Sequence, residues 1–506
     1  MGNDQEMNNF YFLVMISLVF LFPIIIFLLV GRKKAENGLL LPPGPFAWPI
    51  IGNIFNLDPN KPHISMLKLA ESFGPLFSLK LGSRLFIIAS NPTSAREIFK
   101  IHDRELSGRY IPQLTHRIPE VQNSVIALAI ECNERWRFLR SIGHSELFSS
   151  QALQSDSQSR VKRVNKMLEF LNSKEGQLLK IADFVFATVA NIVSRMMVSQ
   201  DLVQNWSHSE KMQAIVRRLI DFGIPGLVDL YPLLSGYDFW SKKRAEDYME
   251  LNRITWGDFV RERRMKQKKL DDDDVGTQDF LDSLIKNSLN DNEIFNFLTE
   301  FFVSSESLTT LIEWAMTELM RNKEALTKLE DELAEAVDEQ GRILRESTLT
   351  KLPYLQAFIK EVFRLHPPSP FLVPRSAIQT CEVMNYGIPK DTIVILNAYA
   401  LGRDPKTWED PLSFKPERFL KNNVDLKGTN YELLPFGGGR RVCAGYPLAL
   451  KQIQLIIASL VHGFHWSLPH GTISTNIDMS EDFNITLRRK NPLLLIPKRK
   501  NYFVVE

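Results

Sequence analysis

The segment PFGGGRRVCAGYPLAL, residues 435–450, places one cysteine, Cys443, where its sulfur could bind a metal ion. The glycines at 437–439 let the backbone approach a flat ligand and adopt positive φ angles. Residues 446–464 predict a helix, whose N-terminal dipole is expected to lower the pKa of the Cys443 thiol and hold it as a thiolate. Such a thiolate could be the axial ligand of a haem iron. The alternative is a buried structural cysteine beside a basic surface loop.

The amino-acid composition limits which other kinds of metal site and which kinds of partner are plausible. The chain has 3 cysteines, Cys132, Cys381 and Cys443, and none belongs to a CxxC pair. A disulfide framework, a zinc finger and an iron–sulfur cluster are therefore poor fits. The 61 Lys and Arg residues nearly balance the 59 Asp and Glu residues, so we expect no nucleic acid partner.

The N-terminal segment predicts a membrane anchor, residues 1–31. Residues 10–30 carry no charge and are long enough, as a helix, to cross a bilayer. Acidic residues precede this run and GRKK follows it, which predicts a single span with the rest of the chain in the cytoplasm. A cleaved signal peptide is the alternative, but the basic residues lie on the wrong side for one. Residues 32–49 predict a basic, proline-rich linker.

The remaining residues predict a mainly α structure with minor β. The segment IEWAMTELMRNKEALTKLEDELAEAV has apolar residues at helical spacing, and a helix is also expected from Phe297 to Ser307. The segment LFSLKLGSRLFIIAS predicts two strands joined at Gly82 and Ser83, and TIVILNAYAL predicts another strand.

The cysteine segment resembles the haem-binding signature of the cytochrome P-450 superfamily. Phe436, Gly439, Arg441, Cys443 and Gly445 match its defining positions. The resemblance runs from LPPGP to LLLIPK and implies one haem-thiolate catalytic domain, residues 50–506, with the cytochrome P-450 fold. It implies haem b as the cofactor, with Cys443 as the iron ligand and Phe436, Gly439 and Arg441 in the cofactor-binding loop.

Two further motifs appear in the order of that family. Glu361 and Arg364 in KEVFR share a helix face, and PERF supplies Arg418; the resemblance implies that these three form a charge-paired triad that braces the cysteine loop. A second set is expected to hold the haem propionates, for which arginine is suited because its planar fork binds carboxylates. This set consists of Trp136 and Arg140 in WRFLR, Arg375 in LVPR, and Arg441.

The motif expected over the distal haem face departs from the family pattern. The family has a small residue, glycine, any residue, an acid and threonine, where this chain has Val303, Ser304, Ser305, Glu306 and Ser307. The resemblance implies that Glu306 and Ser307 relay protons to iron-bound dioxygen. Ser307 lacks the β-branch that fixes a threonine rotamer. Either Ser307 relays adequately, or altered proton delivery gives a substrate radical time to rearrange or couple; neutral drift is the third interpretation.

The resemblance implies an NADPH- and O2-dependent monooxygenase of the endoplasmic reticulum membrane. No dinucleotide, flavin or P-loop fingerprint occurs in the chain, so NADPH–cytochrome P-450 reductase is the expected electron donor. The expected substrate is small and apolar. Glu300, Val303 and Ser304 are its candidate contacts, and Glu300 could bind a substrate ammonium, although a glutamate at the core edge is the alternative.

The segment TCEVMNYGIPKDTIVILNAYALGRDPKTWEDPLSFKPERFL resembles plant enzymes of an alkaloid branch that contains littorine mutase, berbamunine synthase and corytuberine synthase. Because the distal motif is altered, we favour an oxidative rearrangement of the littorine mutase type, in tropane alkaloid biosynthesis. The alternatives are a geraniol-type monoterpenoid hydroxylase, a phenol-coupling benzylisoquinoline oxidase, and an O2-independent haem-thiolate isomerase. A non-catalytic membrane scaffold is the last alternative, and it would bind no haem.

Overall fold

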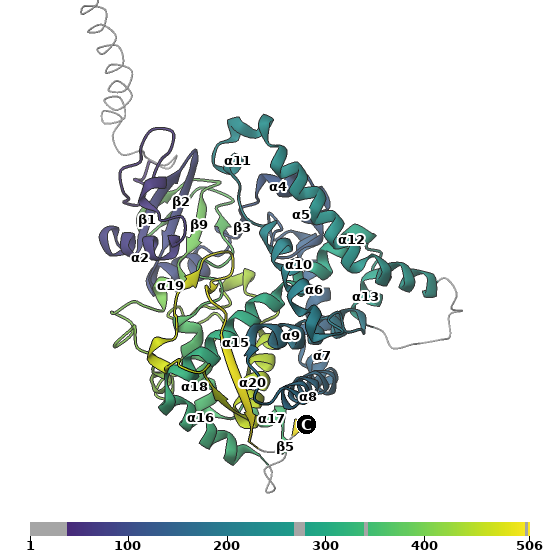
Figure 1. Ribbon diagram of the computed structural model, residues 1–506. Coiled ribbons are helices and arrows are strands. Elements are labelled where there is room, and N and C mark those ends of the chain that lie inside the picture. Colours follow the sequence, from purple (N-terminus) through teal and green to yellow (C-terminus); the bar gives the residue numbers. More distant parts are fainter. Residues whose placement is uncertain (1–37, 268–278, 338–342, 501–503, 506) are drawn as a thin grey trace, which may run out of the picture.

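Helices form most of the molecule, and the largest sheet lies to one side of them (Figure 1). The computed structural model describes residues 38–267, 279–337, 343–500 and 504–505. The predicted mainly α structure with minor β is confirmed. The predicted anchor, residues 1–31, lies outside the described residues.

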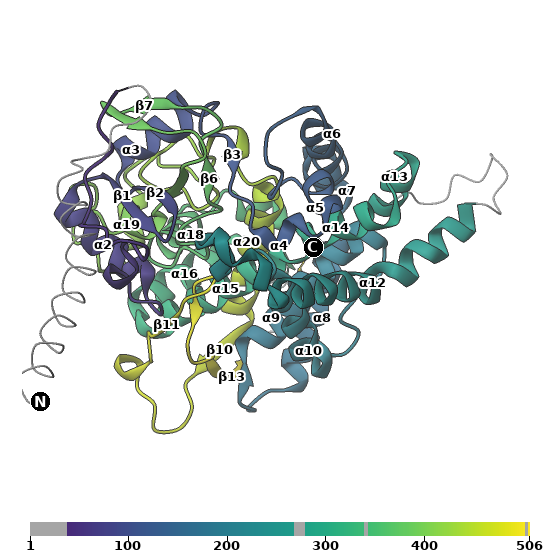
Figure 2. The same ribbon diagram turned by 90° about the horizontal axis from the view of Figure 1, so that it is seen from above.

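Long helices form the central core, and their apolar residues make one continuous buried cluster. These helices are α8 (Ser157–Ser173), α9 (Ile181–Val198), α15 (Ser304–Arg321), α16 (Lys323–Ala336), α18 (Pro353–Leu365) and α20 (Tyr446–Gly463). Helix α15 contacts α9, α18 and α20, and Figure 2 shows it near the middle of the molecule. In the described part of the chain, α9 alone is long and apolar enough for a membrane span, yet 83% of it is buried. It is therefore a core helix.

The largest sheet has the strand order β1-β2-β9-β6-β3. Its strands are β1 (Leu76–Leu81), β2 (Arg84–Ala89), β3 (Gly108–Arg109), β6 (Arg375–Ser376) and β9 (Ile393–Leu396). The predicted β1–β2 hairpin is confirmed, and Gly82 turns it with a φ of 56°. The strand predicted after Thr392 ends at Leu396, because the Asn397 side chain accepts from the Ala400 N–H and begins the short helix α19 (Ala398–Leu401).

The smaller sheets fasten distant parts of the chain together. Strands β10 (Phe464–Ser467), β13 (Leu494–Arg499) and β4 (Leu179–Lys180) form one of them. The two-stranded pairs are β7 (Cys381–Val383) with β8 (Tyr386–Ile388), β11 (Glu481–Asp482) with β12 (Arg488–Arg489), and β5 (Ile343–Leu344) with β14 (Val504–Val505).

The remaining helices surround the core. They are α2 (Pro62–Phe73), α3 (Pro92–Arg96), α4 (Gln113–His116), α5 (Pro119–Ser124), α6 (Glu134–Gly143), α7 (Ser150–Ser155), α10 (Ser209–Asp221), α11 (Leu227–Leu230), α12 (Phe239–Gln267), α13 (Phe280–Lys286), α14 (Asp291–Phe302) and α17 (Glu346–Leu349). The 3-10 and π turns are η1 (Ile54–Asn56), η2 (Glu97–Ile101), η3 (His144–Phe148), η4 (Trp206–His208), η5 (Pro232–Tyr237), η6 (Pro416–Phe419), η7 (Gly439–Arg441) and η8 (Ser474–Asn476).

The helix predicted from Phe297 to Ser307 is interrupted, because α14 ends at Phe302 and α15 begins at Ser304. The Ser304 hydroxyl donates to the Phe301 carbonyl at 2.6 Å, and the Ser305 hydroxyl donates to the Phe302 carbonyl at 2.7 Å. Serine hydroxyls that bond carbonyls of the preceding turn bend helices. The prediction of one continuous helix was therefore wrong, and the two serines supply a physical reason.

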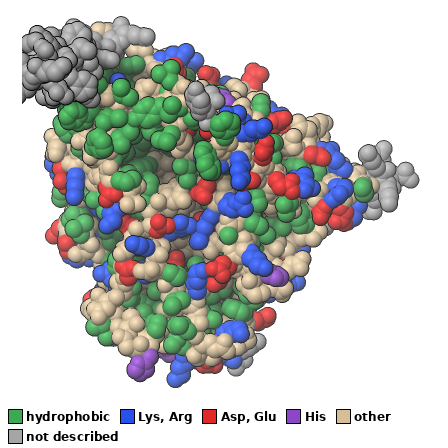
Figure 3. Space-filling view, turned by 45° about the horizontal axis from the view of Figure 1, so that its top comes forward, with side chains coloured by type: hydrophobic (Ala, Val, Ile, Leu, Met, Phe, Trp, Pro, Cys, Tyr) green, Lys and Arg blue, Asp and Glu red, His purple; other side chains and the backbone are tan. Residues whose placement is uncertain are grey.

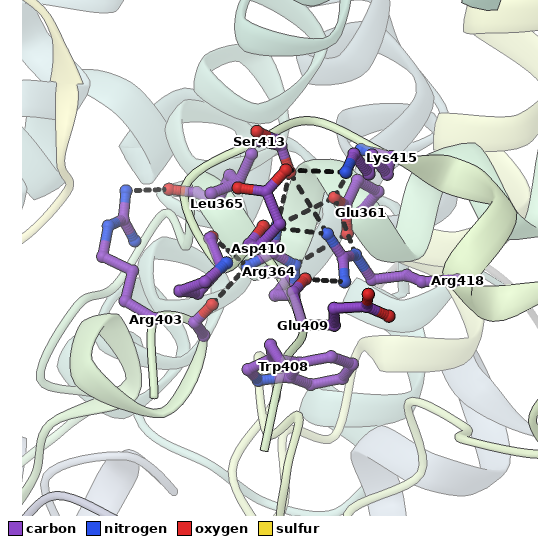
Figure 4. Close-up of polar contacts among 12 residues, drawn as sticks. Glu361, Arg364, Leu365, Arg403, Trp408, Glu409, Asp410, Ser413, Lys415 and Arg418 are labelled. Atoms are coloured by element: carbon purple, nitrogen blue, oxygen red, sulfur yellow. Dashed lines mark hydrogen bonds and ion pairs between the residues drawn. The ribbon is translucent and has the colours of Figure 1, made fainter. Parts of the chain in front are cut away.

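The structure brings the expected triad together, with Glu361 and Arg364 on α18 and Arg418 on η6 (Figure 4). The Arg364 guanidinium donates to both Glu361 carboxylate oxygens, at 2.7 and 2.8 Å, and Arg418 Nε donates to Glu361 at 3.1 Å. The side chains of Glu361 and Arg364 are fully buried. This geometry is the bidentate pairing that gives a buried ion pair most of its strength.

The triad fastens α18 to the segment 402–415. Arg364 donates to backbone carbonyls of Gly402, Pro411 and Ser413, and the Glu361 carboxylate accepts the Lys415 N–H at 2.7 Å. Each of these contacts satisfies a backbone group that a loop would otherwise leave unpaired. Helix α18 also reaches the cysteine segment, because the Phe363 ring meets the Phe436 ring edge-on at 5.1 Å.

Removing one partner of this triad should destabilise the protein strongly. We expect Arg364→Ala to lower the free energy of unfolding by about 3–5 kcal/mol, because the buried Glu361 carboxylate would lose its bidentate partner and keep only the single contact with Arg418 and the Lys415 N–H. The measurement is chemical denaturation. Arg253→Ala is the matched control, since Arg253 and Glu250 have the same spacing but are exposed, and it should change stability little. Equal effects of the two substitutions would contradict this account of the brace.

Candidate active site

A cavity of about 370 Å³ lies between the break at Val303 and the segment that carries Cys443. Aromatic and aliphatic side chains make up most of its wall. They include Phe99, Leu147, Phe148, Phe301, Leu308, Phe363, Val394 and Leu396. The cavity is therefore apolar, and the few polar groups that line it must define what it binds.

Cys443 lines this cavity at the end of a tight loop. Its N–H donates to the Phe436 carbonyl at 2.9 Å, and the Val442 N–H donates to the Gly439 carbonyl at 3.1 Å. Helix α20 begins at Tyr446. The Cys443 side chain is exposed to the cavity, although the surrounding protein shields it from bulk water.

The pKa of the Cys443 thiol is raised, which corrects the expectation from the helix dipole. Burial disfavours the thiolate most, and it exceeds the opposing effects of the Gly445 and Tyr446 N–H groups and of the Arg140 charge. The expected lowering was therefore wrong for the thiol alone. A coordinated metal ion removes a thiol proton outright, so this raised pKa is compatible with a ligand role.

Two glycines of the loop have left-handed backbone angles. Gly437 has a φ of 71° and Gly439 a φ of 63°. A Cβ on Gly439 would lie 2.1 Å from Asp103 Oδ1, whereas a Cβ on Gly437 would come no closer than 3.6 Å to the Leu372 Cδ1 atom. Asp103 is needed in this position because it accepts from Arg375 and from Arg440. Gly439 thus keeps both the loop conformation and an ion-pair network.

Four arginines from separate segments line the same cavity. They are Arg109 of β3, Arg140 of α6, Arg375 of β6 and Arg441 of η7. Each donates to backbone carbonyls that hold its guanidinium in place. The accepting carbonyls are those of Ala127 and Val373 for Arg109, Val442 for Arg140, Gly438 for Arg375, and Ser107, Ile126 and Ala129 for Arg441.

Arg109 is the member of this group that we did not predict from the sequence. It belongs to a two-residue strand and to no spaced motif, so the sequence carried no signal for its role. Its pKa lies well below the ordinary value, first because it is buried and then because Arg375 and Arg441 are close. Burying several guanidiniums together is costly without anions.

Trp136 lies behind these arginines. Its indole N–H donates to the Ile126 carbonyl at 3.1 Å, and its ring is 5.3 Å from the guanidinium carbons of both Arg140 and Arg441. The ring therefore supports the two arginines through cation–π contacts. The expected contact of the indole with a propionate stays a prediction.

The residues fit haem b. A planar apolar ring suits the wall, two propionates would supply the anions that the arginines need, and Cys443 faces the same cavity as a ligand for the iron. Cys443 would hold the iron, and Arg109, Arg140, Arg375 and Arg441 would hold the propionates.

Part of the distal motif also lines the cavity. Glu300 on α14 and Ser304 and Ser307 on α15 are all lining residues, so both helices contribute across the break. Val303 is half-buried and packs among apolar residues instead. Glu306 is buried beside α10, where its carboxylate accepts from Gln213 at 2.9 Å and from Arg217 at 2.8 Å. It is thus one residue from Ser307 but outside the cavity lining.

Glu300 is directed at the cavity by two backbone groups. Its carboxylate accepts the N–H of Ile126 at 2.7 Å and the N–H of Ala127 at 2.6 Å. Burial raises its pKa to about 7, against the opposing effects of these N–H groups and of the Arg140 and Arg441 charges. Two further segments supply other lining residues, namely Pro368, Ser369, Phe371, Leu372, Val373, Ile485 and Thr486.

Haem retention should depend on Gly439 more than on Gly437. We expect Gly439→Ala to lower the haem content of the purified protein, measured as the ratio of Soret to protein absorbance, because its Cβ would displace Asp103. Gly437→Ala is the control, since it introduces the same kind of backbone strain without this collision. Equal losses from the two variants would show that strain alone, and not Asp103, matters.

Stability should fall as Glu300 loses its proton. Burial raises the pKa of Glu300 from 4.5 in the unfolded chain to about 7 in the folded protein. Between these two pH values the folded state keeps a proton that the unfolded state has released, so the free energy of unfolding decreases as the pH rises from the lower value to the higher. We expect the melting temperature of the wild type relative to Glu300→Gln to fall between about pH 5 and about pH 8. A constant difference would contradict the raised pKa. Other groups electrostatically coupled to Glu300 are Arg109, Arg140, Arg441, Cys443 and Tyr248.

Comparison with known proteins agrees with this geometry. The chain is 41% identical over 487 residues to the probable (S)-N-methylcoclaurine 3'-hydroxylase isozyme 2 of Coptis japonica, covering 95% of this chain and 97% of that one. It is 39% identical over 495 residues to corytuberine synthase of Coptis japonica, with 96% and 99% covered. It is 37% identical over 485 residues to cytochrome P450 76C4 of Arabidopsis thaliana, with 93% and 94% covered. Residues 42–496 match the family described as Cytochrome P450, and the chain belongs to that family.

Proposed function

We propose that this cytochrome P450 hydroxylates an aromatic ring of a benzylisoquinoline alkaloid. As a member of the family it is a monooxygenase that uses haem iron and NADPH-derived electrons from a reductase. The observation that supports the substrate class is its similarity, over nearly the whole chain, to (S)-N-methylcoclaurine 3'-hydroxylases of Coptis japonica and Papaver somniferum.

The side chains around the cavity have separate tasks in this proposal. When bound, the haem supplies the activation of dioxygen with electrons from NADPH. Cys443 holds the iron, and the four arginines fix the orientation of the cofactor. The apolar wall excludes water and holds the aromatic rings of the substrate.

Proton delivery is assigned to α15. Glu306 pairs with Arg217, whose side chain is 39% exposed, so this pair connects solvent with the buried start of the helix. In the proposal Glu306 takes up a proton at its carboxylate, and the Ser307 hydroxyl passes a proton into the cavity. Serine in place of threonine keeps the hydroxyl and loses only the β-branch.

Phenol coupling is the second candidate reaction, because corytuberine synthase is similar over nearly the whole chain. The littorine mutase type of rearrangement, expected from the sequence, has the support of the altered positions Ser304 and Ser307. The geraniol-type hydroxylase and the O2-independent isomerase remain alternatives that the product analysis below distinguishes.

The product of (S)-N-methylcoclaurine should contain one added oxygen atom. We expect the purified protein, with reductase, NADPH and 18O2, to yield a product that carries one labelled hydroxyl, measured by mass spectrometry. A product that has lost two hydrogens and gained no label would indicate coupling. A product of unchanged mass would indicate rearrangement. No turnover of benzylisoquinolines, with turnover of a tropane ester or of geraniol, would overturn the proposed substrate.

We further propose that one apolar face of the catalytic domain lies on the membrane. Two segments contact the turn of the β1–β2 hairpin: the Gly82 N–H donates to the Ile51 carbonyl at 3.2 Å, and the Ser83 N–H donates to the Leu230 carbonyl at 2.8 Å. Both segments expose large apolar side chains. These are Trp48, Ile50, Phe55, Leu227, Leu233, Phe239 and Trp240. Figure 3 shows apolar side chains gathered around a hollow on this side of the molecule.

This membrane face should bind lipid without the predicted anchor. In protein that lacks residues 1–31, we expect the double variant Leu233→Asp/Trp240→Asp to reduce sedimentation with phospholipid vesicles, because burying charge in lipid is unfavourable. Leu412→Asp is the control, since Leu412 lies in another segment and is 74% exposed, close to the 78% of Trp240. Unchanged sedimentation of the double variant would refute the assignment.

A further inference from the structure

We propose that Glu300 is the binding site for the protonated amine of the substrate. This inference rests on the proposed function, because a benzylisoquinoline alkaloid carries a basic ring nitrogen. The inference names Glu300 as the residue that recognises this nitrogen. Glu300 would therefore make the protein prefer an amine to a neutral molecule of the same shape.

Glu300 is the one acidic residue among the side chains that line the cavity in the described part of the chain. Ser304, Ser307 and the assigned iron ligand Cys443 line the same cavity. The propionates are assigned to the arginines, so Glu300 is the carboxylate side chain left to pair with a cationic substrate. The surrounding wall is apolar, so the attraction between the two charges is screened less than in water.

Two hydrogen bonds orient the carboxylate of Glu300 and leave some of its acceptor positions free. The N–H groups of Ile126 and Ala127 use one acceptor position on each oxygen. An ionised carboxylate has about four such positions, so both oxygens can still accept a bond from a ligand N–H. Within the described ranges no ion pair to Lys, Arg or His involves Glu300, in contrast to Glu306 with its partner Arg217.

The arginines of the cavity do not neutralise Glu300 directly. Arg140 donates to the Val442 carbonyl, and Arg441 donates to the carbonyls of Ser107, Ile126 and Ala129. Burial raises the pKa of Glu300 to about 7, which means that its charged form lacks compensation. A substrate ammonium beside it would supply that compensation and would be held by a charge-assisted hydrogen bond.

A competing interpretation is that Glu300 only holds the loop at residues 126–127. This role would be indifferent to the charge of the ligand, so a pair of ligands separates the two interpretations. The first ligand is an N-methylated tetrahydrobenzylisoquinoline, which is protonated at neutral pH. The second is the isochroman of the same shape, in which oxygen replaces the ring nitrogen, so that it is neutral.

The test is calorimetric titration of the haem-loaded protein with both ligands, for the wild type, Glu300→Gln and Glu293→Gln. Glu293 is the matched control, because it lies on α14 as well but pairs with Arg135 outside the cavity lining. We expect Glu300→Gln to weaken binding of the amine by about tenfold or more and binding of the neutral ligand by less than about threefold. Glu293→Gln should leave both affinities unchanged.

Two other outcomes would count against the proposal and are distinguishable. If Glu300→Gln weakens both ligands equally, Glu300 holds only the loop, and the inference fails while the proposed function stands. If the wild type binds neither ligand, the proposed substrate class itself fails. If Glu300→Gln does not retain haem, Glu300→Asp replaces it. Because Glu300→Asp keeps the charge, it should still prefer the amine by about threefold or more, and equal affinities would overturn the proposal.

Discussion

The burial of positive charge in an apolar cavity is the constraint on which the rest of this site depends. Arg109, Arg140, Arg375 and Arg441 come from four separate segments and line the same cavity. Their guanidiniums are held by carbonyls of residues 107, 126, 127, 129, 373, 438 and 442, so several loops must be in place together. A cofactor with two carboxylates would compensate this charge, and its binding would therefore also stabilise the loops.

The same constraint explains why the cysteine loop is braced from outside the cavity. The three consecutive glycines at 437–439 leave this part of the loop without side chains to pack. Its position is determined instead by Asp103, which contacts Arg375 and Arg440, and by Phe363 on α18, which meets Phe436. The triad of Glu361, Arg364 and Arg418 in turn fixes α18 to the segment that precedes the loop.

Motifs in the sequence were sufficient to place much of the site. Cys443, Arg140, Arg375, Arg441, Glu300, Ser304 and Ser307 all line one cavity, as the spaced motifs led us to expect. What the sequence did not predict depends on tertiary structure. The break at Val303 results from competition between serine hydroxyls and the helix. Arg109 belongs to no motif, and the raised pKa of Cys443 follows from its burial.

The central claim is that the four arginines bind the propionates of a haem whose iron Cys443 holds. The most direct measurement compares the affinity of the haem-free protein for haem b with its affinity for haem b dimethyl ester, in which both propionates are neutral, by following the Soret band. The account predicts that the ester binds at least about tenfold more weakly, because the buried guanidiniums would stay uncompensated. Equal affinities would contradict it.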